Sequence, residues 1–261
     1  MNSATKPSID DLLEQLKSKL AEPGTSLLPV LSTMSRFTHY SLHNQLLIFL
    51  QHPHTTRVMG FQSWRQAGYQ VRKGEKGIAI YAPMRCNVDN PDTNEPTSRL
   101  RFRIAHVFDI AQVDPIPGSA AAAAIPAPTP AGPLTCLEKL KAFLVGHNIE
   151  LVYEMLERGC YGYTDGKRIT CTTNLASHIE VGTLVHETAH ALLHFGTDRP
   201  TLTVRETEAE AVAYLISEQR GLAETQMSID YIRAYRGTPD TLEASLQRIR
   251  VSALPHLKCY R

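Results

Sequence analysis

Residues 184–194 read Leu-Val-His-Glu-Thr-Ala-His-Ala-Leu-Leu-His, and they carry the strongest chemical signal in the chain. Residues four apart on a helix lie one turn apart on the same face, so His186 and His190 can bind one ion through their imidazoles. Glu187 lies beside that face, where its carboxylate can take a proton from a metal-bound water. The pattern predicts a zinc hydrolase site with two histidine ligands, a third protein ligand, an open coordination position and a carboxylate base.

The third ligand is expected from a glutamate-rich helix 16 residues downstream of His190. Glu206 and Glu210 are four apart and share a helix face, whereas Glu208 is turned about 200° from Glu206 at ~100° per residue. We therefore choose Glu206 as the ligand and Glu210 as the acceptor that orients a histidine ring, because ligating histidines usually donate their second N–H. Glu208 remains the alternative ligand.

His194 lies one further turn along the histidine face, and we expect it in the core or in the layer of side chains behind the ligands. The competing interpretation of the whole motif is a buried helix whose histidines make ordinary hydrogen bonds, in a chain that holds 11 histidines. The apolar residues around the motif and the glutamate-rich helix favour the metal site, because a buried helix needs a reason to carry charged polar groups.

The composition is that of a folded protein. The 261 residues are 43% hydrophobic and 20% charged, with a formal net charge of +1. These values exclude a disordered or fibrous chain and a uniformly basic nucleic-acid coat protein. No apolar run approaches the ~20 residues of a membrane span, and the N-terminus opens no secretory segment, so we expect a cytoplasmic protein without membrane contact. Five scattered cysteines without a Cys-x-x-Cys pair indicate reduced thiols.

Residues 115–133 read PIPGSAAAAAIPAPTPAGP, with six prolines and no charge. Such a segment favours an extended, semi-rigid backbone, so we interpret it as a linker between domains at 1–114 and 134–261. The first domain is expected to begin with an amphipathic helix capped by Ser8 and Asp11 and to continue into antiparallel strands. The second is expected to hold a hairpin turning at Asp165-Gly166, followed by helices. Both orders predict an α+β fold.

A weaker signal precedes the linker. Between Arg57 and Gly77 five cations stand against one anion, with three aromatic residues among them. Cations fit phosphates, and aromatic faces stack on unpaired bases. From composition alone a solvated hairpin over buried aromatics is favoured. As a nucleic-acid site, the region offers Trp64, Arg65, Arg72, Lys73 and Lys76, and a cationic row on a later strand adds Arg101 and Arg103.

A family resemblance changes this balance. Four segments resemble the N-terminal domain of ArdC-type antirestriction proteins, namely Tyr40–Leu47, Val58–Trp64, Val71–Ile78 and His106–Gln112. The resemblance implies binding of single-stranded DNA and an association with plasmids and other mobile elements. The second half resembles the zinc metallopeptidase domain of the ImmA/IrrE group, which implies that His186, His190 and Glu206 hold one Zn²⁺ ion and that Glu187 is the base.

The sequence therefore predicts an α+β antirestriction-like protein with two domains. The first would bind single-stranded DNA, and the second would be a zincin-like metallopeptidase domain acting on a protein substrate. Two alternatives stay open. One is a non-catalytic protein that shields single strands and uses zinc structurally, and the other is a regulatory peptidase that cleaves a repressor.

Overall fold

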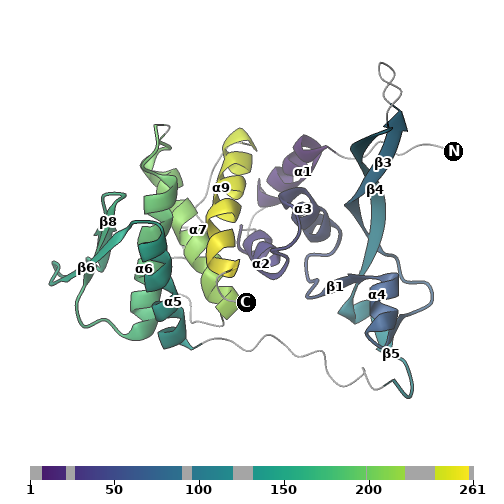
Figure 1. The fold of residues 1–261 in the computed structure, drawn as a ribbon, viewed down its shortest axis with the longest axis horizontal. Coiled ribbons are helices and arrows are strands. Elements are labelled where there is room, and N and C mark those ends of the chain that lie inside the picture. The colour runs from purple at the N-terminus through teal and green to yellow at the C-terminus, as the bar shows by residue number, and fades with distance from the viewer. Residues whose placement is uncertain are drawn as a thin grey trace. The chain divides into compact units, whose positions relative to one another are not determined.

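The structure is a computed structural model of the 261-residue chain, and it describes residues 8–21, 27–89, 96–119, 132–197, 199–220 and 239–258. The fold is α+β, as predicted from the sequence, and Figure 1 labels its helices and strands. The chain divides into two compact units, of which one is Met1–Leu42 with Pro128–Arg261 and the other is His43–Ala127. Among the described residues, no helix combines the length and apolar character that a membrane span requires.

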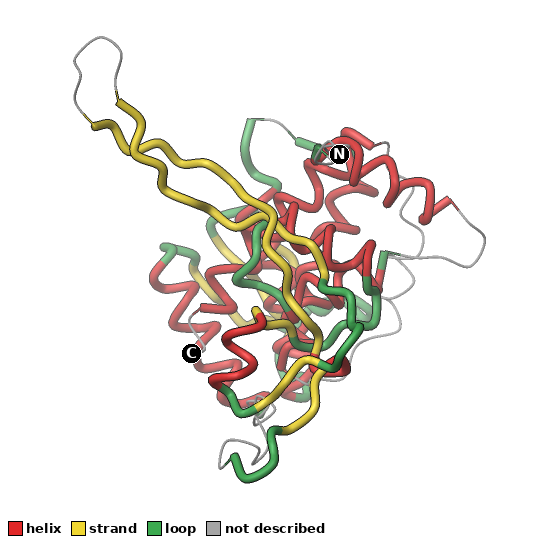
Figure 2. The backbone as a smooth tube through the Cα atoms, turned by 90° about the vertical axis from the view of Figure 1, so that its right-hand side faces the viewer, coloured by secondary structure: helices red, strands yellow, loops and turns green. Residues whose placement is uncertain are grey.

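The His43–Ala127 unit is built on two antiparallel sheets. Its helices are α3 (Leu42–Gln51), α4 (Phe61–Gln66) and the short 3-10 turn η1 (Ile110–Gln112). Its strands are β1 (Val58–Gly60), β2 (Tyr69–Val71), β3 (Ile78–Asp89), β4 (Pro96–Asp109) and β5 (Val113–Pro115). The larger sheet has the order β1-β4-β3, and β2 pairs with β5. Figure 2 shows β3 and β4 side by side as a long twisted ribbon.

The outer edge of β3 is covered near its start, at Ala79 and Tyr81, by two amide side chains of α3. Asn44 bonds both the N–H and the carbonyl of Tyr81, at 2.9 Å each. Gln51 does the same for Ala79, also at 2.9 Å each. Backbone groups that a further strand would satisfy are therefore already paired.

The other unit packs α5 (Pro133–Gly146) and α6 (Ser177–Leu193) of a group of helices against a three-stranded sheet. The other helices of the group are α1 (Ile9–Ala21), α2 (Leu28–Arg36), α7 (Leu202–Arg220) and α9 (Pro239–Lys258). The strands are β6 (Glu150–Glu154), β7 (Gly162–Thr164) and β8 (Arg168–Thr172), in the order β6-β8-β7 with β6 parallel and β7 antiparallel to β8. The sheet therefore ends in the short edge strand β7.

Two local predictions are confirmed. Ser8 and Asp11 form the expected capping box, with each side chain accepting from the other residue's backbone N–H at 3.1 and 2.7 Å. The β7–β8 hairpin turns at Asp165-Gly166, where Asp165 accepts from two backbone N–H groups and Gly166 has a φ of 93°. A Cβ on Gly166 would also lie 2.5 Å from the Phe195 ring, so glycine is required there for both reasons.

The compact units do not coincide with the expected boundaries at residues 114 and 134. Helices α1 and α2 group with the C-terminal helices, because α2 packs on α7 and α1 on α9. Ser32 and Ser35 of α2 bond the carboxylate of Glu218 in α7, at 2.5 and 3.1 Å. Contacts between segments so distant in sequence leave no local pattern. Most of the expected linker, residues 120–131, lies outside the described residues.

Candidate metal centre

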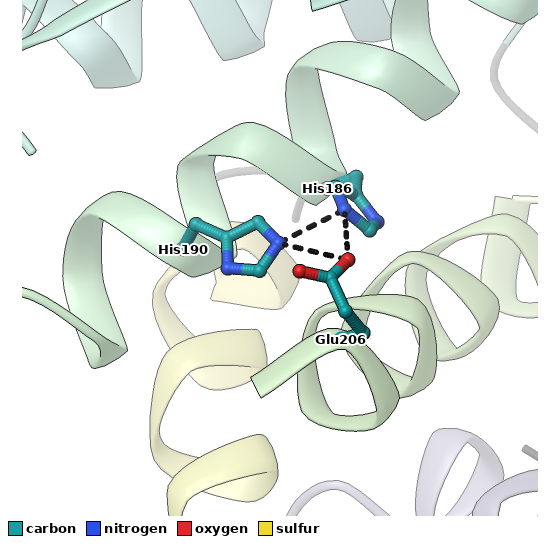
Figure 3. Close-up of side chains that lie close together, drawn as sticks. All are labelled: His186, His190 and Glu206. Carbon is teal, nitrogen blue, oxygen red and sulfur yellow. Dashed lines mark hydrogen bonds and ion pairs between the residues drawn. The ribbon is translucent and has the colours of Figure 1, made fainter. Parts of the chain in front are cut away.

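Helices α6 and α7 bring three metal-binding side chains together (Figure 3). The Nε2 atoms of His186 and His190, one turn apart on α6, are 3.0 Å from each other. Oε2 of Glu206, in the first part of α7, lies 3.5 Å from each of them. The two helices pack on each other, and each has a buried alanine near its ligands, Ala189 on α6 and Ala209 on α7.

The spacing of the three donors fits a divalent metal ion. Zinc ligands at 2.0–2.1 Å in tetrahedral geometry are separated from one another by about 3.3 Å. The three separations here are 3.0, 3.5 and 3.5 Å. Two imidazole nitrogens and one carboxylate oxygen are also a donor set that zinc and other first-row metals accept. The predicted trio of His186, His190 and Glu206 is therefore brought together in a shape suited to one ion.

Hydrogen bonds behind the histidines orient both rings. Nδ1 of His186 lies 3.2 Å from Oε1 of Glu210, the residue expected to fix a histidine ring. Nδ1 of His190 lies 2.9 Å from Nδ1 of His194, whose Nε2 lies 3.1 Å from Oε2 of Glu208. His194 is fully buried, in the position behind the ligands that the sequence predicted.

The chain of contacts ending at Glu208 fixes which nitrogen carries each proton. The guanidinium of Arg248 in α9 donates to both carboxylate oxygens of Glu208, at 2.8 and 2.5 Å, and the carboxylate can therefore only accept. It follows that His194 donates from Nε2 and accepts at Nδ1, so that His190 donates from Nδ1. The lone pair of His190 Nε2 then faces the other two ligand atoms, Nε2 of His186 and Oε2 of Glu206, and is free to bind a metal.

Glu208, the alternative third ligand, lies away from the metal-binding trio. Its side chain is fully buried and also accepts a 2.5 Å hydrogen bond from Ser245. Burial alone would raise the pKa of Glu208, but its hydrogen bonds from His194, Arg248 and Ser245 lower it to about 2. The half-turn between Glu206 and Glu208 therefore separates two roles, with Glu206 facing the ion site and Glu208 supporting the ring behind it.

The carboxylates around His186 create a site for positive charge. Burial would lower the pKa of His186, but hydrogen bonds to Glu206 and Glu210 raise it to about 10. The hydrogen bond from His186 is the largest of the contacts that lower the pKa of Glu206. A proton on His186 and a metal cation are thus alternative ways to meet the same negative field.

Glu187 lies in a cleft of about 540 Å³ that the trio also lines. Burial raises the pKa of its carboxyl group, and the charges of His186 and His190 oppose the rise. Gly162 of β7 backs this side chain, because a Cβ there would lie 2.8 Å from Cγ2 of Thr183 and 3.3 Å from Cγ of Glu187. The other lining residues come from the β7 region and the two helices, and include Tyr161, Tyr163, Phe195 and Arg205.

The candidate nucleic-acid residues fare differently. Trp64 was expected to stack on bases, but it is 0% exposed, and its indole N–H donates to the carbonyl of Phe108 at 2.8 Å. It forms a core cluster with Tyr69 and Val113, so its ring faces are covered and the expectation is corrected. The Trp64 ring packs against β4 in the core. The number of cations near it in the sequence does not reveal that it is buried.

Among the candidate cations, Arg72 differs from the rest. Its guanidinium pairs with Glu75 at 3.0 Å and Asp114 at 3.3 Å and donates to the carbonyl of Ala111, so it holds the loop together. The remaining candidates are exposed, namely Arg65, Lys73, Lys76, Arg101 and Arg103.

Sequence reasoning missed Ser245 and Arg248. Both lie on α9, where their contacts with Glu208 close the network behind His190. The one available signal was the position of Arg248 between Leu246 and Ile249, which are apolar and buried. A cation beside buried apolar positions implies a buried acidic partner, but not which one.

Comparison with known proteins places this fold. Residues 6–108 match the family model described as the N-terminal domain of anti-restriction factor ArdC. The crystal structure of the antirestriction ArdC protein from the R388 plasmid, metal-free, is 21% identical and has a TM-score of 0.51 over 83% of this chain and 81% of that chain. Its Mn(II)-bound structure is 17% identical and has a TM-score of 0.58 over 97% and 98%. At such identities the likeness establishes a shared fold.

A curated relative is the uncharacterized protein pXO2-81 of Bacillus anthracis, 24% identical over 299 residues. The alignment covers 95% of this chain and 50% of that protein, so the chain spans about half the length of this relative. Residues 6–108 thus match the ArdC N-terminal domain, and the chain as a whole shares the fold of the R388 ArdC protein.

Proposed function

We propose that this chain is a cytoplasmic antirestriction protein that binds single-stranded DNA and hydrolyses peptide bonds with a zinc ion held by His186, His190 and Glu206. The observation that carries the hydrolase is the convergence of these three donors beside the buried carboxylate of Glu187, in one cleft. That arrangement is the requirement for metal-assisted hydrolysis, which ordinary hydrogen bonding between helices does not need.

The residues divide the chemistry among themselves. A zinc ion bound there would act as a Lewis acid, which would lower the pKa of a water ligand to near neutral and polarise a carbonyl. Glu187 accepts the proton of the attacking water and returns it to the leaving amine. Its raised pKa brings the carboxyl group closer to the working pH, where a base both accepts and releases a proton readily. Glu210 and His194 hold the histidine rings in the ligating orientation.

Glu187→Gln tests the hydrolase without disturbing the ligands. We expect this variant to hydrolyse a general protein substrate about 10²- to 10⁴-fold more slowly, while it still binds one metal ion per chain. His186→Ala should lose the metal itself, measured by elemental analysis of purified protein, which also decides between zinc and manganese. Full hydrolysis by Glu187→Gln would remove the base assignment.

Exposed cations support the binding of single-stranded DNA. Lys73 and Lys76 lie in the loop before β3, Arg65 on α4, and Arg101 and Arg103 on β4. Side chains of this kind pair with phosphates, and such binding weakens as salt rises because counterions are released. We expect affinity for an oligo(dT) strand to fall steeply between 50 and about 200 mM salt. Affinity that does not change with salt would contradict a phosphate-binding site here.

A protein that only shields the strand is the second candidate, and the same exposed cations favour it. Protection of incoming DNA in cells, compared with nuclease protection of a single strand in vitro, separates the two functions. If shielding is the whole function, Glu187→Gln leaves protection in a conjugation or transformation assay unchanged, and a Lys73→Gln/Lys76→Gln double variant abolishes it. If hydrolysis is required, both variants lose antirestriction in cells, although only the lysine variant loses nuclease protection in vitro.

A further inference from the structure

Strand β4 presents two unlike faces. Val107 points to the buried side, opposite Ile78 of β3. Residues in the alternate positions point the other way, and among them Phe102 is 55% exposed and Ile104 is 48% exposed. Large apolar side chains this exposed add little to the core. Neighbouring ones on one strand therefore indicate a surface that contacts a partner.

The exposed row continues onto α4. His106 and Phe108 follow Ile104 on the same face of β4, and the Phe108 ring lies 6.3 Å from the ring of Phe61, which is 45% exposed. Gly77 makes room for this continuation, because a Cβ there would lie 2.8 Å from Cβ of His106 and 3.0 Å from the Phe108 ring. The row therefore runs from β4, past Gly77 at the end of the loop before β3, to α4.

The charge around the row is positive. Arg65 is one turn from Phe61 on α4, and Lys76 directly precedes Gly77. Arg101 and Arg103 flank Phe102 in the sequence, so their exposed side chains project from the opposite face of the two-stranded ribbon. Among the acidic side chains that the structure describes in this unit, Glu75 and Asp114 pair with Arg72, and Asp109 is buried and accepts backbone N–H groups. An anionic partner would therefore meet cations that are still exposed.

We propose that Phe61, Phe102 and Ile104 form a stacking face for the bases of single-stranded DNA, with the phosphates held by exposed cations such as Arg65 and Lys76. The inference rests on the proposed binding of single-stranded DNA and assigns its base contacts, a role that buried Trp64 cannot fill. Unpaired bases stack on aromatic faces without regard to sequence, while Watson–Crick pairing in a duplex keeps those faces covered. The surface therefore favours an unpaired strand over a duplex.

The test is equilibrium binding of a fluorescein-labelled oligo(dT) strand, followed by anisotropy, with the full chain. Phe102→Ala should bind about 5- to 150-fold more weakly, the loss typical of one base-stacking aromatic. Phe102→Tyr keeps an aromatic face and should restore binding to within about twofold of the unaltered chain. The matched control is Met84→Ala, since Met84 is a 39% exposed apolar residue that pairs with Arg101 on the opposite face of the same ribbon.

The outcomes separate this inference from the function on which it rests. An unaltered chain that binds no single strand at low salt contradicts the proposed DNA binding itself. Tight binding that Phe102→Ala and Phe61→Ala weaken no more than Met84→Ala overturns the stacking face alone. Equal affinity for single strand and duplex overturns it as well, because stacking then contributes nothing. A dimer in sedimentation that Phe102→Ala dissociates would show that the face binds a second copy of the chain.

Discussion

The metal centre on α6 and α7 and the ribbon of β3 and β4 arrange their polar groups in opposite ways. In the metal centre each ligating histidine has a partner for its second nitrogen, and the partner of His190 is itself held by Glu208 and Arg248. On the ribbon the cations and the aromatic Phe102 are exposed. A single ion demands fixed donors, whereas a flexible strand with repeating phosphates can be bound by mobile ones.

The largest expected effect tests the fixed side of this comparison. Glu208→Gln removes the charge that holds His194 and, through it, His190, so we expect metal binding to weaken about 10- to 100-fold. A chelator competition measures the affinity, and ¹⁵N NMR of the histidine rings reports which nitrogen of His190 carries the proton. The tautomer should become mixed in the variant.

The matched control for this variant is Glu218→Gln. Glu218 lies on the same helix and is bonded to Ser32 and Ser35, away from the metal-binding trio. It should lose some stability and no metal affinity. If both variants bind metal equally well, the network behind His190 is structural only.

The pH dependence of metal affinity is expected to be the next largest effect. His186 must be neutral to bind a metal, and its pKa is raised to about 10 by the hydrogen bonds to Glu206 and Glu210. Below that pH the ion has to displace a proton, so affinity rises with pH, about tenfold from pH ~7 to ~8. Isothermal titration in two buffers of different ionisation enthalpy counts the protons released, and a count of zero would contradict the prediction.

A stability measurement tests how closely β7 approaches the metal-binding helix. Gly162→Ala adds a Cβ that would lie 2.8 Å from Thr183 and 3.2 Å from the carbonyl of Thr170, so we expect a loss of about 1–3 kcal/mol in the free energy of unfolding. Gly182→Ala on α6 is the control, because a Cβ there meets nothing within 4 Å. It should gain about 0.5–1 kcal/mol from helix propensity. Urea denaturation measures both.

The smallest expected effect belongs to the exposed side of the comparison. Lys76→Gln should reduce the slope of log affinity against log salt for oligo(dT) by about 0.7, the value for one phosphate contact on a single strand. Lys141→Gln is the control, since Lys141 belongs to the other unit and pairs with Glu180 at 3.5 Å. Equal slopes for the two variants would place the DNA elsewhere.

Prediction from sequence succeeded where the controlling geometry is local. Helix periodicity alone was enough to put His186 and His190 on one face and to separate Glu206 from Glu208. The turn at Gly166 likewise follows from the residues of the turn itself. These features depend on neighbours a few residues away, so they are visible in a short window of sequence.

Prediction failed where a side chain's role is set by distant segments. An aromatic residue among cations has the same sequence pattern whether it is exposed, like Phe102, or buried, like Trp64. Whether a strand packs over its ring determines which of the two occurs. The pairing of Arg248 with Glu208 joins residues 40 apart in the chain. The grouping of α2 with α7 depends on the same kind of long-range contact.

The two amides that cover β3 have a consequence for how the protein behaves at high concentration. A long ribbon normally offers its outer edge to any extended peptide, including the same strand of another molecule. Asn44 and Gln51 occupy the hydrogen-bonding positions of Tyr81 and Ala79, so an incoming strand has to break four bonds before it can form its own. The faces of the ribbon are thus available to a ligand, while its edge at Ala79 and Tyr81 is closed to an added strand.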